Sequence, residues 1–203
     1  MDVYFSPLAC SLASRITLYE SGQEAQFHRV DTKAGKTASG EDYRKINPKG
    51  LVPALRTDDG AVLTENAAIL QYLADQRPGS GLAPAGFARY QLQQWLSFIG
   101  SELHKSVFTP LLSPTYPAEG KAKAKEAAAD KLSYLNDHLT GRDWLLDDFS
   151  VADAYLAAVL NWNQAVKLDF SVYPAIQAYQ ARLMTRPAVQ KAVGEEFALF
   201  QPA

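Results

Sequence analysis

Cys10 is the only cysteine of the chain, and its position suggests a reactive thiol. The apolar segment Val3 to Phe5 predicts a strand, and a helix is expected to open near Ser11. The first turn of a helix offers unpaired N–H groups and a positive dipole end, which stabilise a thiolate. Such a position can lower a cysteine pKa from about 8.5 to about 3.5–7.5. The alternative is a buried structural cysteine, and position alone leaves both interpretations open.

Two later segments carry groups that could bind a ligand. Pro53 opens an expected strand after Val52, and only about 5% of such bonds are cis in folded proteins, so an ordinary strand-edge proline is favoured. Asn66 precedes an expected helix and is predicted to be its N-cap. A helix N-terminus also attracts a carboxylate, and the adjacent Glu65 could take an ammonium. Together these groups suit the head group of an amino acid, although capping alone also explains Asn66.

His104 lies at the edge of the apolar stripe of a long expected helix, beside Lys105, whose charge could receive an anion. A histidine on a helix surface is more often a bystander than a catalyst, and no spacing links His104 to Cys10. His28 and His138 are expected to be structural.

Metal and nucleotide chemistry are not supported by the sequence. Three scattered histidines and one cysteine give no ligand spacing such as C-x-x-C or H-E-x-x-H, so no metal is expected. The Walker phosphate loop and the G-x-G-x-x-G pattern are both absent.

The composition limits the class of protein. The chain has 203 residues, 47% of them hydrophobic, with a net charge of -2 and no run of five or more like charges, so neither nucleic acid nor an anionic membrane is expected as a partner. The longest apolar stretch, residues 154–160, is far shorter than the roughly 20 residues that cross a bilayer. A single cysteine cannot form an internal disulfide, and the first residues lack the pattern of a secretory signal. A reducing, cytoplasmic location is therefore expected.

The elements that must position these residues fall into two parts. In the first part the patterns predict β-α-β followed by β-β-α, with strands at 3–5, 27–31, 52–56 and 61–63 and helices at 11–21 and 66–76. Beyond a glycine- and proline-rich segment they predict only helices, at 92–107, 118–139, 150–166, 175–184 and 188–196. Ser150 and Asp153 resemble a capping box. We therefore expect an α/β domain at 1–77, a linker at 78–86 and an all-α domain at 87–203.

Five segments together resemble one known family. They are Cys10-Ser11-Leu12-Ala13-Ser14, Asn47-Pro48-Lys49-Gly50-Leu51-Val52-Pro53-Ala54-Leu55, Thr64-Glu65-Asn66-Ala67-Ala68-Ile69, Glu102-Leu103-His104-Lys105 and Ser150-Val151-Ala152-Asp153-Ala154-Tyr155. Their order and spacing are similar to those of the bacterial beta-class glutathione S-transferases over nearly the whole chain. The resemblance implies a thioredoxin-like N-terminal domain with the glutathione site, and a helical C-terminal domain that forms the wall for a second substrate.

The resemblance also implies roles for residues of the first domain. The position matching Pro53 is a cis proline in that family, and the backbone of the position matching Val52 pairs with the cysteinyl part of glutathione. Positions matching Glu65 and Asn66 hold the γ-glutamyl end. Cys10 is then a catalytic and glutathione-binding residue.

Other implied contacts come from the helical domain and from one loop. Positions matching His104 and Lys105 lie near the sulfur and the glycyl end, and His104 is the second catalytic residue. A lysine of the loop 32–40 is expected to help. Both Lys33 and Lys36 fit, and spacing favours Lys36.

The implied function is conjugation of the glutathione thiolate to apolar electrophiles, a detoxification reaction that needs no metal. Thiol–disulfide exchange through Cys10 is a further chemistry. The family is typically a homodimer, which implies that residues such as Ser97 reach toward the partner's site. Related members use an asparagine near the position of Ser97 for this contact, and this chain has no asparagine there. Two alternatives stay open: glutathione-dependent dehalogenation of aromatic metabolites, and a glutathione-binding module without turnover. The sequence does not identify the electrophile. Phe108, Tyr116 and Trp162 are candidates for its pocket or for core packing.

Overall fold

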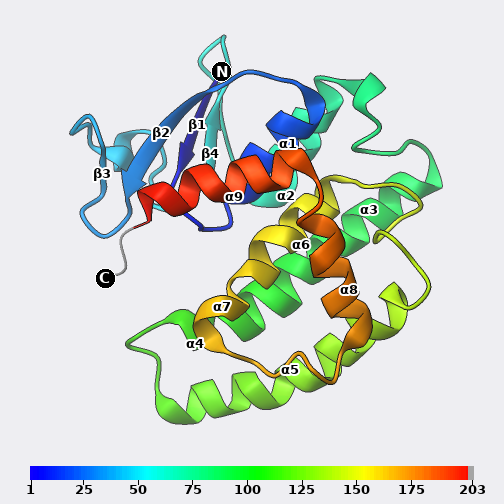
Figure 1. Ribbon diagram of the computed structural model, residues 1–203. Coiled ribbons are helices and arrows are strands. Elements are labelled where there is room, and N and C mark those ends of the chain that lie inside the picture. Colours follow the sequence, from blue (N-terminus) through cyan, green and yellow to red (C-terminus); the bar gives the residue numbers. More distant parts are fainter. Residues whose placement is uncertain (201–203) are drawn as a thin grey trace.

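A five-stranded mixed sheet forms the first part of the computed structural model, which describes residues 1–200 (Figure 1). Its strands are β1 (Asp2–Phe5), β2 (Gln26–Asp31), β3 (Lys36–Thr37), β4 (Ala54–Arg56) and β5 (Val62–Thr64), in the order β3-β2-β1-β4-β5. β1 and β2 are parallel, and the other neighbours are antiparallel. The short edge strand β3 was not expected from the sequence, and β4 begins two residues later than predicted.

Alternating side chains of β1 enter two different cores. Val3 packs with Leu18 of helix α1 (Leu12–Ser21) and Leu73 of helix α2 (Asn66–Asp75) on one face. Tyr4 packs on the opposite face with Tyr43 of the 3-10 helix η1 (Tyr43–Lys45). This period of two is the geometry of a strand buried on both faces. The β1-α1-β2 unit confirms the predicted βαβ order.

From α2 to residue 200 the described chain forms helices and loops only, as predicted. They are the 3-10 helix η2 (Pro78–Ser80), α3 (Phe87–Phe98), the π-helical segment η3 (Ile99–Phe108), α4 (Thr109–Leu112), α5 (Ala118–Leu139), α6 (Val151–Asn161), α7 (Asn163–Val166), α8 (Pro174–Leu183) and α9 (Pro187–Leu199). The predicted helix over 92–107 belongs to the continuous rod α3-η3-α4, whereas the predicted helix over 150–166 is broken at Trp162.

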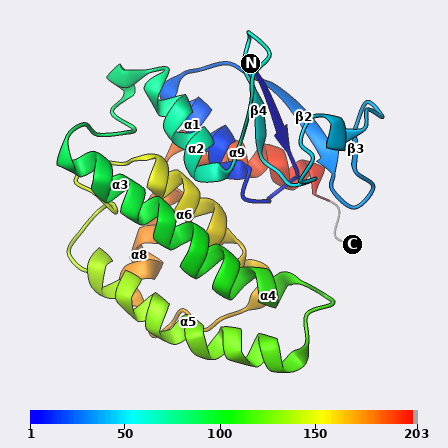
Figure 2. The ribbon, with the colours of Figure 1, turned by 180° about the vertical axis from the view of Figure 1, so that it is seen from behind.

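Helix α6 is the centre of the helical part, and Figures 1 and 2 show it between α3 and α8. Nearly every side chain of α6 is buried, because it also packs against α1. Helix α9 returns across the first part and packs on the same α1 (Figure 1). One hydrophobic core therefore includes Leu12 and Ile16 of α1 together with Leu156 of α6.

Candidate functional site

Two adjoining cavities meet at Cys10 and His104. The first, about 510 Å³ and called here the polar cavity, is bordered by Cys10, Val52, Pro53, Glu65, Asn66, His104, Lys105 and Tyr155, among others. The second, about 680 Å³ and called the apolar cavity, is bordered by Leu8, Cys10, His104, Leu112, Trp162 and Phe197, among others. The structure thus brings together every predicted site residue except Lys36. A group held beside Cys10 in the polar cavity would face the apolar cavity.

Lys36 lies apart from both cavities. It is exposed in β3, opposite Asp31, and Lys33 of the same loop does not border them either. Thr32 is the residue of this loop that reaches the polar cavity. A role for Lys36 therefore stays a prediction.

The Cys10 thiol is held in the protonated form. Burial raises its pKa to about 11, and the nearby Lys105 ammonium opposes this only in part. The sulfur donates to the carbonyl oxygen of Val52 at 3.4 Å. Of the two interpretations that the position of Cys10 left open, the lowered pKa does not hold, because α1 begins only at Leu12 and desolvation outweighs the helix N-terminus.

The segment that carries Val52 is held in place by side-chain hydrogen bonds to the preceding residue. Asn47 Nδ2 and Tyr43 Oη both donate to the carbonyl oxygen of Leu51, at 2.7 and 2.8 Å. The Val52–Pro53 peptide bond is cis, as the resemblance implied. The backbone of Val52 therefore borders the polar cavity in a defined conformation.

Asn66 does not cap its helix, which corrects the sequence prediction. It is the first residue of α2, and its Nδ2 donates to the carbonyl oxygen of Cys10 at 2.9 Å. The N-cap is Glu65, whose φ of 72° is unusual for a residue other than glycine. Strained residues of this kind cluster at functional sites. The buried Oδ1 of Asn66 has no hydrogen-bond partner within residues 1–200.

Lys49 is a site residue that the sequence did not reveal. Its ammonium pairs with the Glu65 carboxylate and donates to Thr64 Oγ1 at 2.8 Å. In the sequence Lys49 belongs to a turn signal, and a pairing across sixteen positions leaves no local pattern.

His104 is neutral and is held by a second unforeseen residue, Tyr155 of α6. Burial, and then the charge of Lys105, lowers the pKa of His104 to about 4. Its Nδ1 lies 2.8 Å from Tyr155 Oη, and its ring packs edge-on against Trp162 with centroids 4.8 Å apart. The π-helical segment carries this histidine, and Thr109 Oγ1 donates to its carbonyl oxygen at 2.9 Å. Tyr155 belongs to one of the five matching segments, but only packing of α6 against the long helix reveals its contact.

Known proteins resemble this chain over almost its whole length. Glutathione S-transferase GstA of Escherichia coli O157:H7 is 45% identical over 199 residues, which are 97% of this chain and 98% of that protein. The chain belongs to the glutathione S-transferase family. Models of the N-terminal and C-terminal domains of glutathione S-transferases match residues 9–76 and 100–187.

Solved structures place this transferase among the bacterial beta-class glutathione S-transferases. The beta-class enzyme of Sphingomonas chungbukensis is 43% identical, with a TM-score of 0.92 over 97% of this chain and 98% of that chain. A sphingomonad glutathione S-transferase solved in complex with glutathione is 47% identical, with a TM-score of 0.93 over 97% and 99%. The resemblance and the fold class inferred from the sequence are confirmed.

The loop before α1 of the transferase is tied to the helical part at Leu8, which has a φ of 58°. The Leu8 N–H donates to Glu196 Oε2 at 2.8 Å, and its carbonyl oxygen accepts from Trp162 Nε1 at 2.7 Å. Of the three aromatic candidates, Trp162 borders the apolar cavity. Phe108 is buried and packs against the Trp162 ring, and Tyr116 does not border this cavity.

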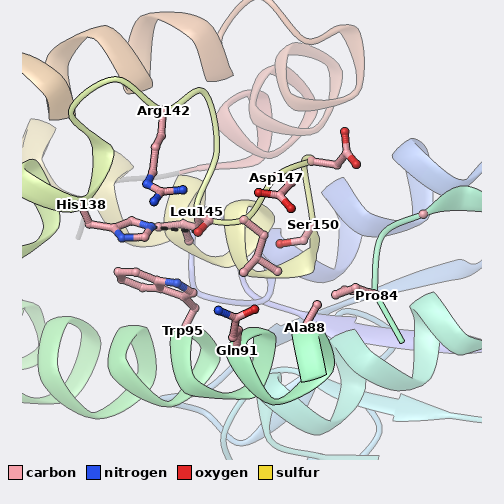
Figure 3. Close-up of a pocket in the computed structure, with 12 residues that line it drawn as sticks. Pro84, Ala88, Gln91, Trp95, His138, Arg142, Leu145, Asp147 and Ser150 are labelled. Atoms are coloured by element: carbon pink, nitrogen blue, oxygen red, sulfur yellow. Dashed lines mark hydrogen bonds between the residues drawn. The ribbon is translucent and has the colours of Figure 1, made fainter. Parts of the chain in front are cut away.

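A separate cavity of about 220 Å³ lies between α3 and the loop that follows α5 (Figure 3). His138 and Trp95 pack together on one side of it, and His138 Nε2 donates to the carbonyl oxygen of Leu145 at 2.9 Å. His28 pairs with Asp2 at 3.0 Å. Both histidines thus have structural contacts, as the sequence predicted, and the cavity contains none of the predicted site residues.

The described part of the chain has neither a metal-binding cluster nor a membrane-spanning helix. Residues 1–200 contain no group of three or more histidine, cysteine, aspartate or glutamate side chains that could hold a metal ion. Among the same residues, no helix has both the length and the apolar character needed to cross a membrane.

Proposed function

We propose that this glutathione transferase binds glutathione in the polar cavity and transfers its sulfur to an electrophile in the apolar cavity. The observation that carries the proposal is the position of Cys10 and His104 on the border shared by the two cavities. A thiolate placed there is next to polar groups on one side and to an apolar chamber on the other. The relative solved with glutathione supports the choice of cosubstrate.

The polar cavity offers a complementary group for each end of the tripeptide. The exposed Glu65 carboxylate suits the γ-glutamyl ammonium, and its pairing with Lys49 is the contact that the ligand would compete with. The N-terminus of α2 suits the γ-glutamyl carboxylate. Lys105 is proposed for the glycyl carboxylate, and the Val52 backbone for the cysteinyl peptide. No metal is needed for any of these contacts.

Catalysis would consist of positioning and of stabilising the sulfur anion. A neutral His104 and a protonated Cys10 are both able to donate a hydrogen bond to that anion. A thiol with a raised pKa is a poor nucleophile at neutral pH, because the thiolate is the attacking species. We therefore assign Cys10 first to the glutathione site, with thiol–disulfide exchange as its second chemistry.

The variant Cys10→Ala separates these two tasks. We expect it to bind glutathione and to conjugate a chloronitroarene at a rate lowered roughly tenfold, since one hydrogen bond to a charged acceptor is worth about 1.5 kcal/mol or somewhat more and His104 still donates to the sulfur. Reduction of a mixed disulfide should fall by more than about a hundredfold, because no other cysteine is present.

Steady-state assays of both reactions, with calorimetric measurement of glutathione binding, check this expectation. Cys10→Ser is the matched control, because it keeps a donor but loses the sulfur. Loss of both reactions with glutathione still bound would contradict the division of roles.

The two alternative functions have their own tests. Chloride release from chlorinated aromatic metabolites would favour the dehalogenase alternative. Glutathione binding without turnover on a broad electrophile panel would favour the non-catalytic module.

We also propose a homodimer that uses the outer side of α3 (Figure 2). Phe87 and Tyr90 of this helix are 77% and 67% exposed, which is unusual for two neighbouring aromatic side chains. Ser97 is exposed on the same helix, one turn before Ser101 of the polar cavity. A partner on this face would therefore lie close to bound glutathione. A cytoplasmic location stays a proposal that rests on the single cysteine.

Sedimentation velocity tests the dimer. We expect the wild-type chain to sediment as a dimer and the double variant Phe87→Asp with Tyr90→Asp to shift toward monomer, since buried charges disfavour an interface. Val172→Asp is the control, because Val172 is 64% exposed but lies between α7 and α8. A monomeric wild type would contradict the proposal.

A further inference from the structure

Tyr155 places its hydroxyl at one nitrogen of the His104 ring. The tyrosine lies on the buried helix α6 and is only 4% exposed. Its Oη is 2.8 Å from His104 Nδ1, with the two rings nearly perpendicular at 86°. The hydroxyl also lies against Gly100 of η3, where an added Cβ would be 3.7 Å away, at ordinary contact distance. The contact is therefore held by packing on a rigid element.

The other ring nitrogen of His104 is free to meet a ligand. Within residues 1–200, Nε2 has no hydrogen-bond partner, while the ring borders both cavities beside Cys10. The edge-on contact with Trp162 also supports the ring. A sulfur held next to Cys10 would thus meet the Nε2 side of the imidazole.

The proton arrangement of this ring decides what the sulfur meets. His104 is neutral, so one ring nitrogen carries a proton and the other carries a lone pair. If the Tyr155 hydroxyl donates to Nδ1, the proton stays on Nε2 and faces the cavity. In the reverse arrangement a lone pair of Nε2 would face the sulfur anion and repel it. The charged and titratable groups nearby are Cys10 and Glu65, which come from two other segments, and Lys105, which follows His104 on η3.

We infer that Tyr155 is a positioning residue that donates its hydroxyl proton to His104 Nδ1 and so fixes Nε2–H as the hydrogen-bond donor to the glutathione sulfur. The inference rests on the proposed glutathione site. It assigns His104 the role of a neutral donor, because an imidazole with a pKa of about 4 is a weak base. Burial also raises the pKa of the Tyr155 phenol, so this hydroxyl keeps its proton.

The tautomer can be measured without glutathione. Nuclear magnetic resonance of the protein with isotope-labelled histidine distinguishes Nε2–H from Nδ1–H, and His104→Gln assigns the signal among the three histidines. We expect the Nε2–H form in the wild type and a mixture in Tyr155→Phe. Tyr179→Phe is the control, because it removes another buried hydroxyl of the helical part, bonded to Asp153. An Nδ1–H wild type, or an unchanged spectrum in Tyr155→Phe, would overturn the inference.

The functional consequence is measured with glutathione. Tyr155→Phe should lower kcat for chloronitroarene conjugation about tenfold and raise the apparent pKa of bound glutathione by about one unit, since the sulfur loses an oriented donor. The KM for glutathione should change less than about twofold. The double variant with His104→Ala should be no slower than His104→Ala alone, because the tyrosine acts through that histidine.

Equal kcat and apparent pKa in Tyr155→Phe and Tyr179→Phe would also overturn the inference. A wild type that fails to bind glutathione would contradict the proposed function instead, and the spectra would still decide the tautomer.

Discussion

Replacement of Asp153 with alanine is expected to lower the free energy of unfolding by about 4 kcal/mol or more, because this buried carboxylate satisfies several donors at once. One oxygen accepts from the Leu145 N–H at 3.0 Å and from Tyr179 Oη at 2.8 Å. The other accepts from the N–H and the hydroxyl of Ser150, both at 2.9 Å. Asp153 is fully buried, so the donors that it satisfies are shielded from bulk water.

The magnitude follows from the groups that are left without a partner. Loss of a helix cap costs about 1 kcal/mol, and each buried donor without an acceptor costs about 1–3 kcal/mol. Domains are stable by only about 5–15 kcal/mol, so the variant would be close to unfolding. Chemical denaturation gives the value directly. A loss below about 2 kcal/mol would show that the network relaxes.

Two further variants control this measurement. Asp153→Asn keeps the shape and one acceptor, so it should lose less stability than alanine. Asp147→Ala removes an exposed carboxylate from the neighbouring loop and should change the free energy of unfolding by less than about 0.5 kcal/mol.

The same network shows what the sequence can and cannot predict. The capping box of Ser150 and Asp153 is visible because its two members are three residues apart in any helix that starts there. The contacts of Asp153 with Leu145 and Tyr179 depend on how the loop and α8 pack against α6. Local signals of this kind also predicted the helix end at Gly22, which is in the left-handed conformation.

At the functional site, motifs identify the residues, but they do not predict properties that depend on burial or packing. The resemblance of the motifs to those of the family assigns Cys10, Glu65 and His104 to one site, and the polar cavity is bordered by all three. The position of Cys10 could not decide whether its pKa is lowered or raised, because desolvation is a property of the folded chain. Asn66 was assigned to a cap because capping is a local preference, whereas in the structure a distant carbonyl oxygen takes its amide. Tyr155 was missed because its partner lies fifty-one positions away.

The glycine- and proline-rich segment at 78–86 marks where strands give way to helices, but the packing does not stop there. Helix α1 of the first part packs against α6 and α9 of the second. Side chains of both parts therefore share one core, and the site lies along their contact. A boundary drawn from composition alone does not show this contact.

Glu196→Ala is expected to disturb both this contact and the apolar cavity. Glu196 is fully buried and accepts from Arg15 Nε at 3.0 Å and from the Leu8 N–H at 2.8 Å. Arg15 is itself buried, with its guanidinium over the ring of Phe27 and a second bond to the half-exposed Glu195. Removal of one partner of a buried ion pair typically costs about 3–5 kcal/mol, and Glu195 should keep the loss near the lower end.

The functional effect of this variant follows from the strained residue that Glu196 holds. Leu8 borders the apolar cavity with a φ of 58°, and its loop would relax once the acceptor is lost. We expect the KM for the electrophile to rise several-fold, with a smaller change in glutathione affinity. Denaturation at pH 8 and steady-state kinetics check the two effects, and equal changes in both substrates would contradict a local role.

Glu196→Gln tests the charge of this residue apart from its shape. Burial raises the pKa of Glu196 to about 7, above its ordinary value of 4.5, although Arg15 opposes the shift. A raised pKa in the folded state means that the stabilising contribution of the protonated group is complete below about pH 4.5 and is lost as the pH rises to about 7. Glutamine is neutral throughout and keeps the acceptor for Leu8. Between about pH 4.5 and pH 7 the free energy of unfolding of the wild type should therefore fall relative to that of Glu196→Gln. The same dependence of this free energy on pH in both proteins would contradict a raised pKa of Glu196.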